Sequence, residues 1–315
     1  MDPKISVIFP VGKGEDYLKY LRPAIESILR QSLTDFEFLI IEDGVSSQIE
    51  SIIDSYQDYR IKRLKFPINM GASAARNAGL LMVKAPYIAV MDSDDVAMPD
   101  RFARQYTWME SHHDVTVCGS NFIKMFGDGI RTSVCYPESD GMIKSLLLVV
   151  DSAIHNPTTM FRTEFVRKYR LQYDANFPRD HDYRFFVEMM RNGARFYGLQ
   201  EELLLYRRHE GNITNGRLGL DEEKTKVREI LLPIFFPELT GEEGRILLIG
   251  FCEHIKMTMM EAYYCIITMS KALRENRTLI GEDREELKKI IQYYLERLLK
   301  LVNGTTNAGH QVDPE

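Results

Sequence analysis

Short apolar segments alternate with helical patterns over the first 95 residues, and this alternation restricts the possible folds more than any other feature. The four segments span residues 5–9, 36–41, 61–66 and 87–91. Each is mostly apolar and is bounded by turn residues or charge. Near-continuous apolar runs of this length are typical of strands buried on both faces of a parallel sheet.

Helical spacing fills the intervals between these segments. Apolar or small side chains that share a face are Ala24, Ile25, Ile28 and Leu29 in the first interval, and Ala74, Ala75, Ala78, Gly79 and Met82 in the last. Pro23 fits the first helix if it lies in the first turn. Strand and helix in regular succession predict βαβ units and a doubly wound α/β sheet.

The pattern changes beyond residue 100. We expect strands over 115–126, 158–162 and 194–206, and helices near 99–112 and 182–192. Helical segments then follow over 222–236, 243–275 and 283–302. The sequence therefore predicts an α/β domain over 1–217 and a helical region over 218–303. Residues 304–315 have little to bury and are expected to form a disordered tail.

The composition excludes several classes of protein. Lys and Arg number 40 against 46 Asp and Glu, a net charge of −6, whereas nucleic-acid binders normally carry a basic excess. The four cysteines show no paired spacing, which argues against a disulfide framework or a zinc site. Neither a signal peptide nor a continuous apolar run of about 18 residues is present. We therefore expect a cytoplasmic protein without a nucleic-acid partner.

The sharpest local feature is the acidic run Asp92-Ser93-Asp94-Asp95, directly after an apolar strand. Three neighbouring carboxylates repel one another and are stabilised by a cation. Oxygen ligands suit Mg²⁺ or Mn²⁺, which commonly share their coordination sphere with substrate phosphates. Open α/β sheets bind ligands at the carboxyl ends of their strands. The alternative is a solvated acidic turn that caps the helix starting near Pro99.

Three further segments carry polar groups toward the same part of the fold. Asp43 follows the second strand, where a carboxylate can accept an N–H of a nucleobase or a ribose hydroxyl, or cap a helix. Residues 69–77 resemble a loop entering a helix, whose free N–H groups and Arg76 could meet a diphosphate. Asp180, His181 and Asp182 open a predicted helix, and capping explains only one of the two acids. The other is a candidate general base.

Several motifs in order carry a family resemblance. They are KISVIFP, AIESILRQS, FEFLIIEDG, NMGASAARNAG, YIAVMDSDD, MPDRFARQ and HDYRFFVEMMRNG. Over roughly residues 4–215 the chain resembles the inverting family-2 glycosyltransferases of the GT-A fold. The resemblance implies a Rossmann-like, mostly parallel sheet with flanking helices and an α-helical C-terminal extension. It also implies a nucleotide-binding half over about 1–98 and an acceptor half over about 99–217.

The resemblance also implies roles for single residues. Those expected to bind a nucleotide-sugar donor, with UDP favoured, are Pro10, Asp43, Arg76, Asp92 and Ser93. Asp94, with Asp92, would bind Mn²⁺ or Mg²⁺, and His209 is a further candidate ligand. Asp182 would be the general base, with Asp180 as the second candidate. The expected acceptor side comprises His155, Asn156, His181 and Tyr183.

Two positions depart from the family pattern. The Tyr-Asn pair that many members carry after the first strand is replaced by Pro10-Val11-Gly12-Lys13, and the Glu that precedes the base is His181. The implied activity is that of a hexosyltransferase. Asp182 would deprotonate an acceptor hydroxyl that attacks the anomeric carbon, and the metal would stabilise the departing diphosphate.

The acceptor implied by the resemblance is a glycan or lipid-linked glycan of bacterial capsule or O-antigen synthesis, at the inner face of the membrane. Mixed charges on the last helix favour packing or homodimerisation of the C-terminal helices over peripheral membrane contact. Two other functions stay open. A sugar-nucleotide nucleotidyltransferase should carry a Gly-rich loop with Arg and Lys after the first strand, which Val11-Gly12-Lys13-Gly14 only faintly matches. The other is a catalytically silent assembly module.

Overall fold

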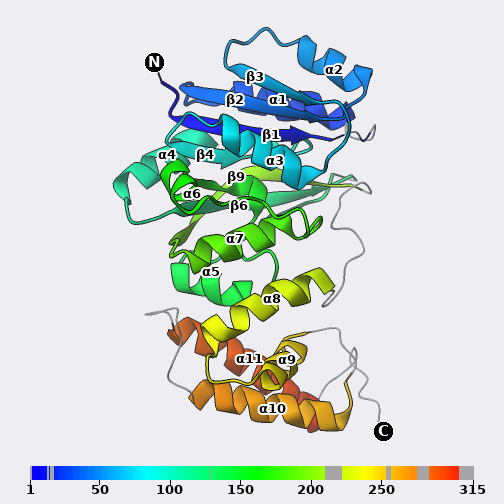
Figure 1. Cartoon of the computed structure of the whole chain (residues 1–315), viewed down its shortest axis with the longest axis vertical. Coiled ribbons are helices and arrows are strands. Elements are labelled where there is room, and N and C mark those ends of the chain that lie inside the picture. The colour runs from blue at the N-terminus through cyan, green and yellow to red at the C-terminus, as the bar shows by residue number, and fades with distance from the viewer. Residues whose placement is uncertain are drawn as a thin grey trace. The chain divides into compact units, whose positions relative to one another are not determined.

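The computed structural model describes residues 2–12, 14, 18–127, 129–209, 222–252, 257–274 and 284–304 (Figure 1). Two compact units make up the chain. The first contains Met1–Ser139 and Ile154–Asn215, and the second contains Asp140–Ala153 and Gly216–Glu315. The predicted disordered tail, apart from Gly304, lies outside the described residues.

Parallel strands form one half of the sheet in the first unit, as predicted. They are β1 (Ile5–Val11), β2 (Phe36–Asp43), β3 (Ile61–Phe66) and β4 (Tyr87–Val90). Their order is β3-β2-β1-β4, and every neighbouring pair is parallel. All eight residues of β2 and all four of β4 are buried, because helices cover both faces of this part of the sheet.

Helices α1 (Leu18–Leu29) and α3 (Ala72–Met82) pack on opposite faces of these strands, with α3 toward the viewer in Figure 1. The α3 side depends on Gly79, since a Cβ atom there would lie 2.6 Å from Cγ2 of Ile8. Helices α2 (Ser47–Asp54) and α4 (Arg101–Ser111) join the α1 side. Pro23 lies within α1 rather than in its first described turn. Its exposed position lets water bind the carbonyl that loses its N–H partner.

The other half of the sheet mixes both strand directions. Its long strands are β6 (Val117–Phe126) and β9 (Phe196–Arg208), which pair in parallel, and the short β8 (Met160–Arg162) runs antiparallel between β4 and β6. Short antiparallel partners β5 (Val96–Ala97) and β7 (Arg131–Val134) border β9 and β6. A 3₁₀ turn (Asn156–Thr158) and helices α6 (Thr163–Tyr169) and α7 (His181–Arg191) complete the unit.

The second unit is helical. It contains the predicted C-terminal helices, and also Asp140–Ala153, which the sequence analysis placed within the α/β domain over 1–217. Its helices are α5 (Asp140–Leu147), α8 (Glu222–Phe235), α9 (Gly241–Gly250), α10 (Met259–Arg274) and α11 (Arg284–Val302). The single segment expected over 243–275 is wrong, because α9 ends at Gly250 and α10 packs back against it. A Cβ atom on Gly250 would lie 2.6 Å from Cε of Met269. None of the helices in the described part of the chain is long and apolar enough to cross a membrane.

Candidate functional site

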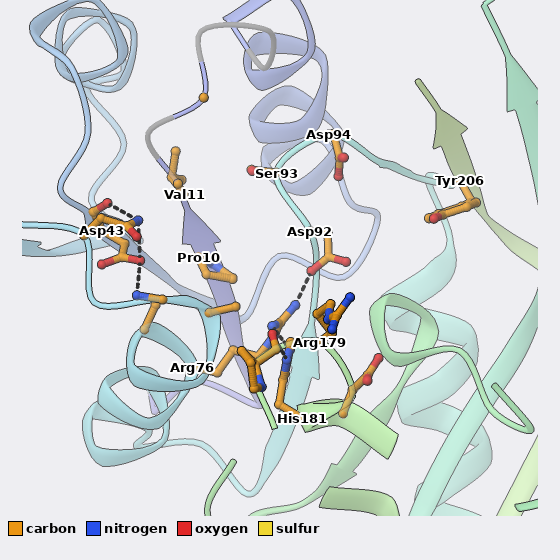
Figure 2. A pocket seen from close by; sticks show the side chains of 18 residues that line it. Pro10, Val11, Asp43, Arg76, Asp92, Ser93, Asp94, Arg179, His181 and Tyr206 are labelled. Atoms are coloured by element: carbon orange, nitrogen blue, oxygen red, sulfur yellow. Dashed lines mark hydrogen bonds and ion pairs between the residues drawn. The ribbon is translucent and has the colours of Figure 1, made fainter. Parts of the chain in front are cut away.

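A cavity of about 390 Å³ lies at the carboxyl ends of β1, β2 and β4 (Figure 2). Open α/β sheets offer their ligand sites at this edge. Eight of the residues singled out in the sequence line the cavity. They are Pro10, Asp43, Arg76, Asp92, Ser93, Asp94, His181 and Asp182. Five others, Asp180, Tyr183, His155, Asn156 and His209, do not.

Asp43 anchors the loop that enters α3. Its Oδ1 accepts the N–H of Met70 at 2.6 Å, and its Oδ2 accepts the N–H of Gly71 and the amide of Asn69, both at 2.9 Å. The next residue, Gly44, has a φ of 62°, and a Cβ atom there would lie 2.3 Å from the Asn69 nitrogen. The close approach of the two loops therefore requires glycine at this turn. The carboxylate is only 3% exposed, yet it borders the cavity.

Arg76 lies beneath the acidic loop as a buried cation, 6% exposed. Its Nη2 donates to Oδ1 of Asp92 at 2.6 Å, and its Nη1 lies 2.5 Å from Nε2 of His181 (Figure 2). The ring of Tyr173 lies 5.7 Å from the guanidinium carbon. Burial is the largest single effect and disfavours the charged form, but Asp92, Tyr173 and Asp182 together outweigh it, so the pKa of Arg76 is raised. Arg76 is thus a permanent positive charge inside the site.

The three acids after β4 have different surroundings. The Asp92 side chain is 30% exposed, whereas Asp94 is 7% exposed and its Oδ2 lies 2.9 Å from Nε2 of His209. Burial and the neighbouring Asp92 raise the pKa of Asp94. Asp95 is fully buried, and its Oδ1 accepts the N–H of Arg207 at 2.8 Å. Burial and the charges of Asp94 and Asp92 hold its pKa well above the usual range.

The chemistry of this acidic loop fits a divalent cation that is shared with a ligand. No group of three or more His, Cys, Asp or Glu side chains is placed to hold a metal within the described residues. Mg²⁺ commonly takes only one or two carboxylates and completes its shell with water and phosphate oxygens. Asp92 and Asp94 both border the cavity and supply that number.

Only one of the two candidate bases faces the cavity. Asp180 is the N-cap residue of α7, is 4% exposed and does not line the cavity. Asp182 stands in the first turn of α7 and does line it. Its Oδ1 accepts the N–H of Tyr183 at 2.8 Å. A carboxylate at a helix N-terminus is stabilised by the helix dipole, which favours its ionised form.

The remaining residues expected on the acceptor side are placed differently. Tyr183 is fully buried, and Asn156 is 2% exposed with its Oδ1 3.4 Å from the hydroxyl of Tyr173. The ring of His155 stacks on Phe122, with centroids 4.5 Å apart, and meets Tyr206 edge-on at 4.6 Å. Burial lowers the pKa of His155 to about 4. Of the four expected residues, His181 alone borders the cavity.

Two residues near the site were not among the predicted site residues. Tyr206 on β9 lines the cavity and carries the aromatic contact to His155. Arg101 is fully buried behind the acidic loop and donates from Nη2 to the carbonyls of Val90 and Thr159. Burial lowers the pKa of Arg101 to about 10. An arginine that starts an amphipathic helix is usually exposed, so the sequence carries no signal for this burial.

Comparisons with known proteins agree on one family. The model of the family described as "Glycosyl transferase family 2" matches residues 6–170, which include Asp43, Arg76 and the acidic loop but not α7. The chain is similar to an uncharacterized glycosyltransferase of Methanocaldococcus jannaschii, with 32% identity over 210 residues, 65% of this chain and 71% of that protein. It is also similar to the O-antigen biosynthesis glycosyltransferase WbnJ of Escherichia coli, with 30% identity over 226 residues, 69% of this chain and 85% of that protein.

The fold has a solved counterpart. The structure of residues 1–349 of TarS from S. aureus, in complex with UDP-GlcNAc, superimposes with a TM-score of 0.60. The match covers 96% of this chain and 92% of that chain, at 17% sequence identity. At this identity the likeness concerns the architecture of the two chains.

Proposed function

This chain belongs to glycosyltransferase family 2 and has the GT-A fold, and we propose that it transfers a hexose from a nucleotide-diphosphate donor to an acceptor hydroxyl with inversion. One observation carries the proposal. Residues far apart in the sequence bring four carboxylates, Asp43, Asp92, Asp94 and Asp182, to a single cavity at the carboxyl ends of the strands. Their separate surroundings suit separate roles toward donor, metal and acceptor.

The donor half of the cavity suits a nucleotide diphosphate. Gly71 and Ala72 at the start of α3 line this side, and the free N–H groups of a helix N-terminus favour phosphate. Asp43 already accepts three hydrogen bonds, and because a carboxylate has about four acceptor sites, one remains for a base N–H. Pro10 and Ser93 border the same space. The UDP-GlcNAc in the TarS structure supports a UDP-sugar as donor.

The acidic loop would hold the metal ion. Asp94, with Asp92, would bind Mn²⁺ or Mg²⁺, and His209, which contacts Asp94, is a further candidate ligand. The ion, when bound, supplies positive charge that stabilises the leaving diphosphate. Burial and the neighbouring charge of Asp92 raise the pKa of Asp94, and a divalent ion between the two carboxylates would oppose this effect.

The acceptor half would be served by Asp182. Its carboxylate takes the proton of the acceptor hydroxyl while the oxygen bonds to the anomeric carbon and the bond from that carbon to the diphosphate breaks. Asp182 is preferred to Asp180 because it borders the cavity and Asp180 does not. The likeness to WbnJ, an O-antigen biosynthesis glycosyltransferase, supports a surface glycan, or its lipid-linked precursor, as acceptor. Such an enzyme would act in the cytoplasm, at the inner face of the membrane.

The first test is thermal unfolding with UDP, GDP or dTDP, each with Mn²⁺ or with EDTA. A ligand at about a hundredfold above its Kd adds about 2.7 kcal/mol of stability, which is an easily measured shift. We expect one nucleotide to stabilise the protein only with metal, and this response to be lost in Asp94→Ala. Asp100→Asn, an exposed residue without a side-chain cap bond, is the control. The donor site is refuted if no nucleotide stabilises the wild-type protein.

The second test identifies the reaction by its product. Incubation with the selected nucleotide sugar should release nucleoside diphosphate, whereas a nucleotidyltransferase would release pyrophosphate. Asp182→Asn should keep nucleotide binding but lose about 100-fold to 10,000-fold in turnover, the usual contribution of a general base. Asp180→Asn should stay near the wild-type rate. Binding without any turnover in the wild-type protein would favour the silent assembly module.

A further inference from the structure

One buried arginine joins the two halves of the cavity. Arg76, from α3, contacts Asp92 of the acidic loop at 2.6 Å and His181 of α7 at 2.5 Å. The partners come from segments 16 and 105 residues away in the sequence. Because His181 directly precedes Asp182, a contact that fixes the histidine also fixes the backbone from which the proposed base extends.

The hydrogen bonds assign a single protonation state to His181. A guanidinium carries only donors, so Nε2 of His181 must present its lone pair to Arg76. Nδ1 lies 3.3 Å from the carbonyl oxygen of Pro178, which can only accept, so Nδ1 carries the proton. The ring that satisfies both contacts is neutral. The His181 side chain is buried, at 5% exposure.

Charges of both signs surround His181, so its neutral state is assigned from the two hydrogen bonds. Arg76 faces it from α3, and the N-terminus of α7 adds its partial positive charge, and both disfavour an imidazolium. Opposing them are Asp92 on the far side of Arg76, the N-cap residue Asp180, and Asp182 in the first turn of α7. Arg179 precedes the helix, and Tyr173 meets the imidazole edge-on at 5.9 Å. A neutral acceptor holds the guanidinium without neutralising it.

We propose that His181, as the neutral Nδ1–H tautomer, is a positioning residue of the transferase. His181 positions Arg76 by a hydrogen bond, and Arg76 in turn positions Asp92. This chain of contacts fixes the position of Asp92, on the donor side, relative to Asp182, on the acceptor side. A carboxylate at position 181 would add a negative charge to a cavity that must accept an anionic diphosphate, whereas imidazole supplies the same hydrogen bond without it. The expected effect on kinetics rests on the proposed function. The tautomer of His181 rests on the hydrogen bonds alone.

Kinetics test the positioning role with two variants at position 181. His181→Leu removes the acceptor at similar volume and leaves a buried guanidinium N–H without its partner, so kcat/KM should fall about tenfold to 100-fold. His181→Gln offers an amide oxygen in place of Nε2 and should stay within about threefold of the wild-type value. His112→Gln, an exposed histidine outside the cavity, is the control. The positioning role is wrong if Gln is as damaging as Leu, or if Leu is harmless.

A double-mutant cycle separates positioning from packing. In the Arg76→Met background, His181→Leu should lower kcat/KM by less than about twofold, because the guanidinium through which His181 acts has been removed. Additive losses would mean that His181 merely packs against its neighbours and would overturn the inference. Thermal unfolding of each variant, with and without UDP and Mn²⁺, shows whether a loss of activity reflects a loss of folding.

A measurement independent of turnover tests the tautomer. In protein labelled with ¹⁵N-histidine, the signals absent from the His181→Gln spectrum belong to His181. At about pH 7.5, where histidine in water is neutral, we expect a protonated Nδ1 and an unprotonated Nε2. The opposite tautomer or an imidazolium overturns the inference even if the enzyme is active. The expected tautomer in a protein that binds no nucleotide would instead refute only the proposed function.

Discussion

Asp43→Asn should destabilise the protein before any ligand is added. The carboxylate accepts three hydrogen bonds, two of them from the backbone of Met70 and Gly71. An amide can present only one oxygen, so in either orientation its NH₂ group faces at least one N–H donor. Hydrogen bonds to a charged group contribute about 1.5–3 kcal/mol each, and we estimate a loss of about 3 kcal/mol. In a unit of about 200 residues this lowers Tm by about 6–12 °C.

Differential scanning calorimetry without nucleotide is the assay. The matched control is Asp54→Asn, since Asp54 also accepts a hydrogen bond, from Arg63, but its side chain is 60% exposed and should contribute little. If Asp43→Asn unfolds at the wild-type temperature and loses only nucleotide binding, the carboxylate does not anchor the loop. The reasoning from its three hydrogen bonds would then be refuted.

Three further predictions concern packing and protonation. Gly198→Ala should cost about 1–3 kcal/mol in urea denaturation, because its Cβ atom would lie 2.2 Å from the carbonyl oxygen of Pro137, whereas Gly127→Ala, with open space, should be neutral. In the folded protein a thiol reagent should label the exposed Cys135 and spare Cys118, whose pKa burial raises to about 12; labelling of Cys118 without denaturant would contradict this. The free energy of unfolding should fall as the pH drops from 6.5 toward 4. The reason is that His155 takes up a proton in the unfolded chain but not in the folded protein, where burial lowers its pKa to about 4. Urea denaturation of His155→Phe should show a weaker pH dependence over this range.

Apolar continuity made the parallel half of the fold predictable. The structure confirms all four strands, and three of them are mostly apolar runs that end in a turn. The fourth, β3, alternates apolar and charged residues, and none of its residues is buried. Strands β5 and β7 gave no such signal, because they have two and four residues and pair mainly through their backbones. The division between α9 and α10 was also hidden, since the apolar residues continue past Gly250. Such breaks are decided by tertiary packing, not by local periodicity.

The acids of the site were predictable, but their partners were not. Position at a strand end marked Asp43, Asp92 and Asp94, because the carboxyl ends of parallel strands meet at one edge. Asp43 accepts hydrogen bonds from the loop before α3, and Arg76 lies between Asp92 and His181. These contacts join residues 16 to 105 positions apart in the sequence, which local patterns do not reveal. His155 and Asn156 were expected on the acceptor side but do not line the cavity. Their sequence, two polar residues in a loop, did not indicate that His155 stacks on Phe122 or that Asn156 is buried.

Three of the cavity's four carboxylates, those on the donor side, can be ordered by what balances each charge. Asp43 is met by three N–H groups and Asp92 by the permanent cation of Arg76. Asp94 meets the imidazole of His209, which is charged only when protonated, and burial together with the charge of Asp92 raises the pKa of Asp94. A diphosphate would add negative charge beside it. Under the proposed function, Asp94 is therefore the carboxylate that most needs a divalent ion, and metal dependence follows from the electrostatics of the site as well as from its motif.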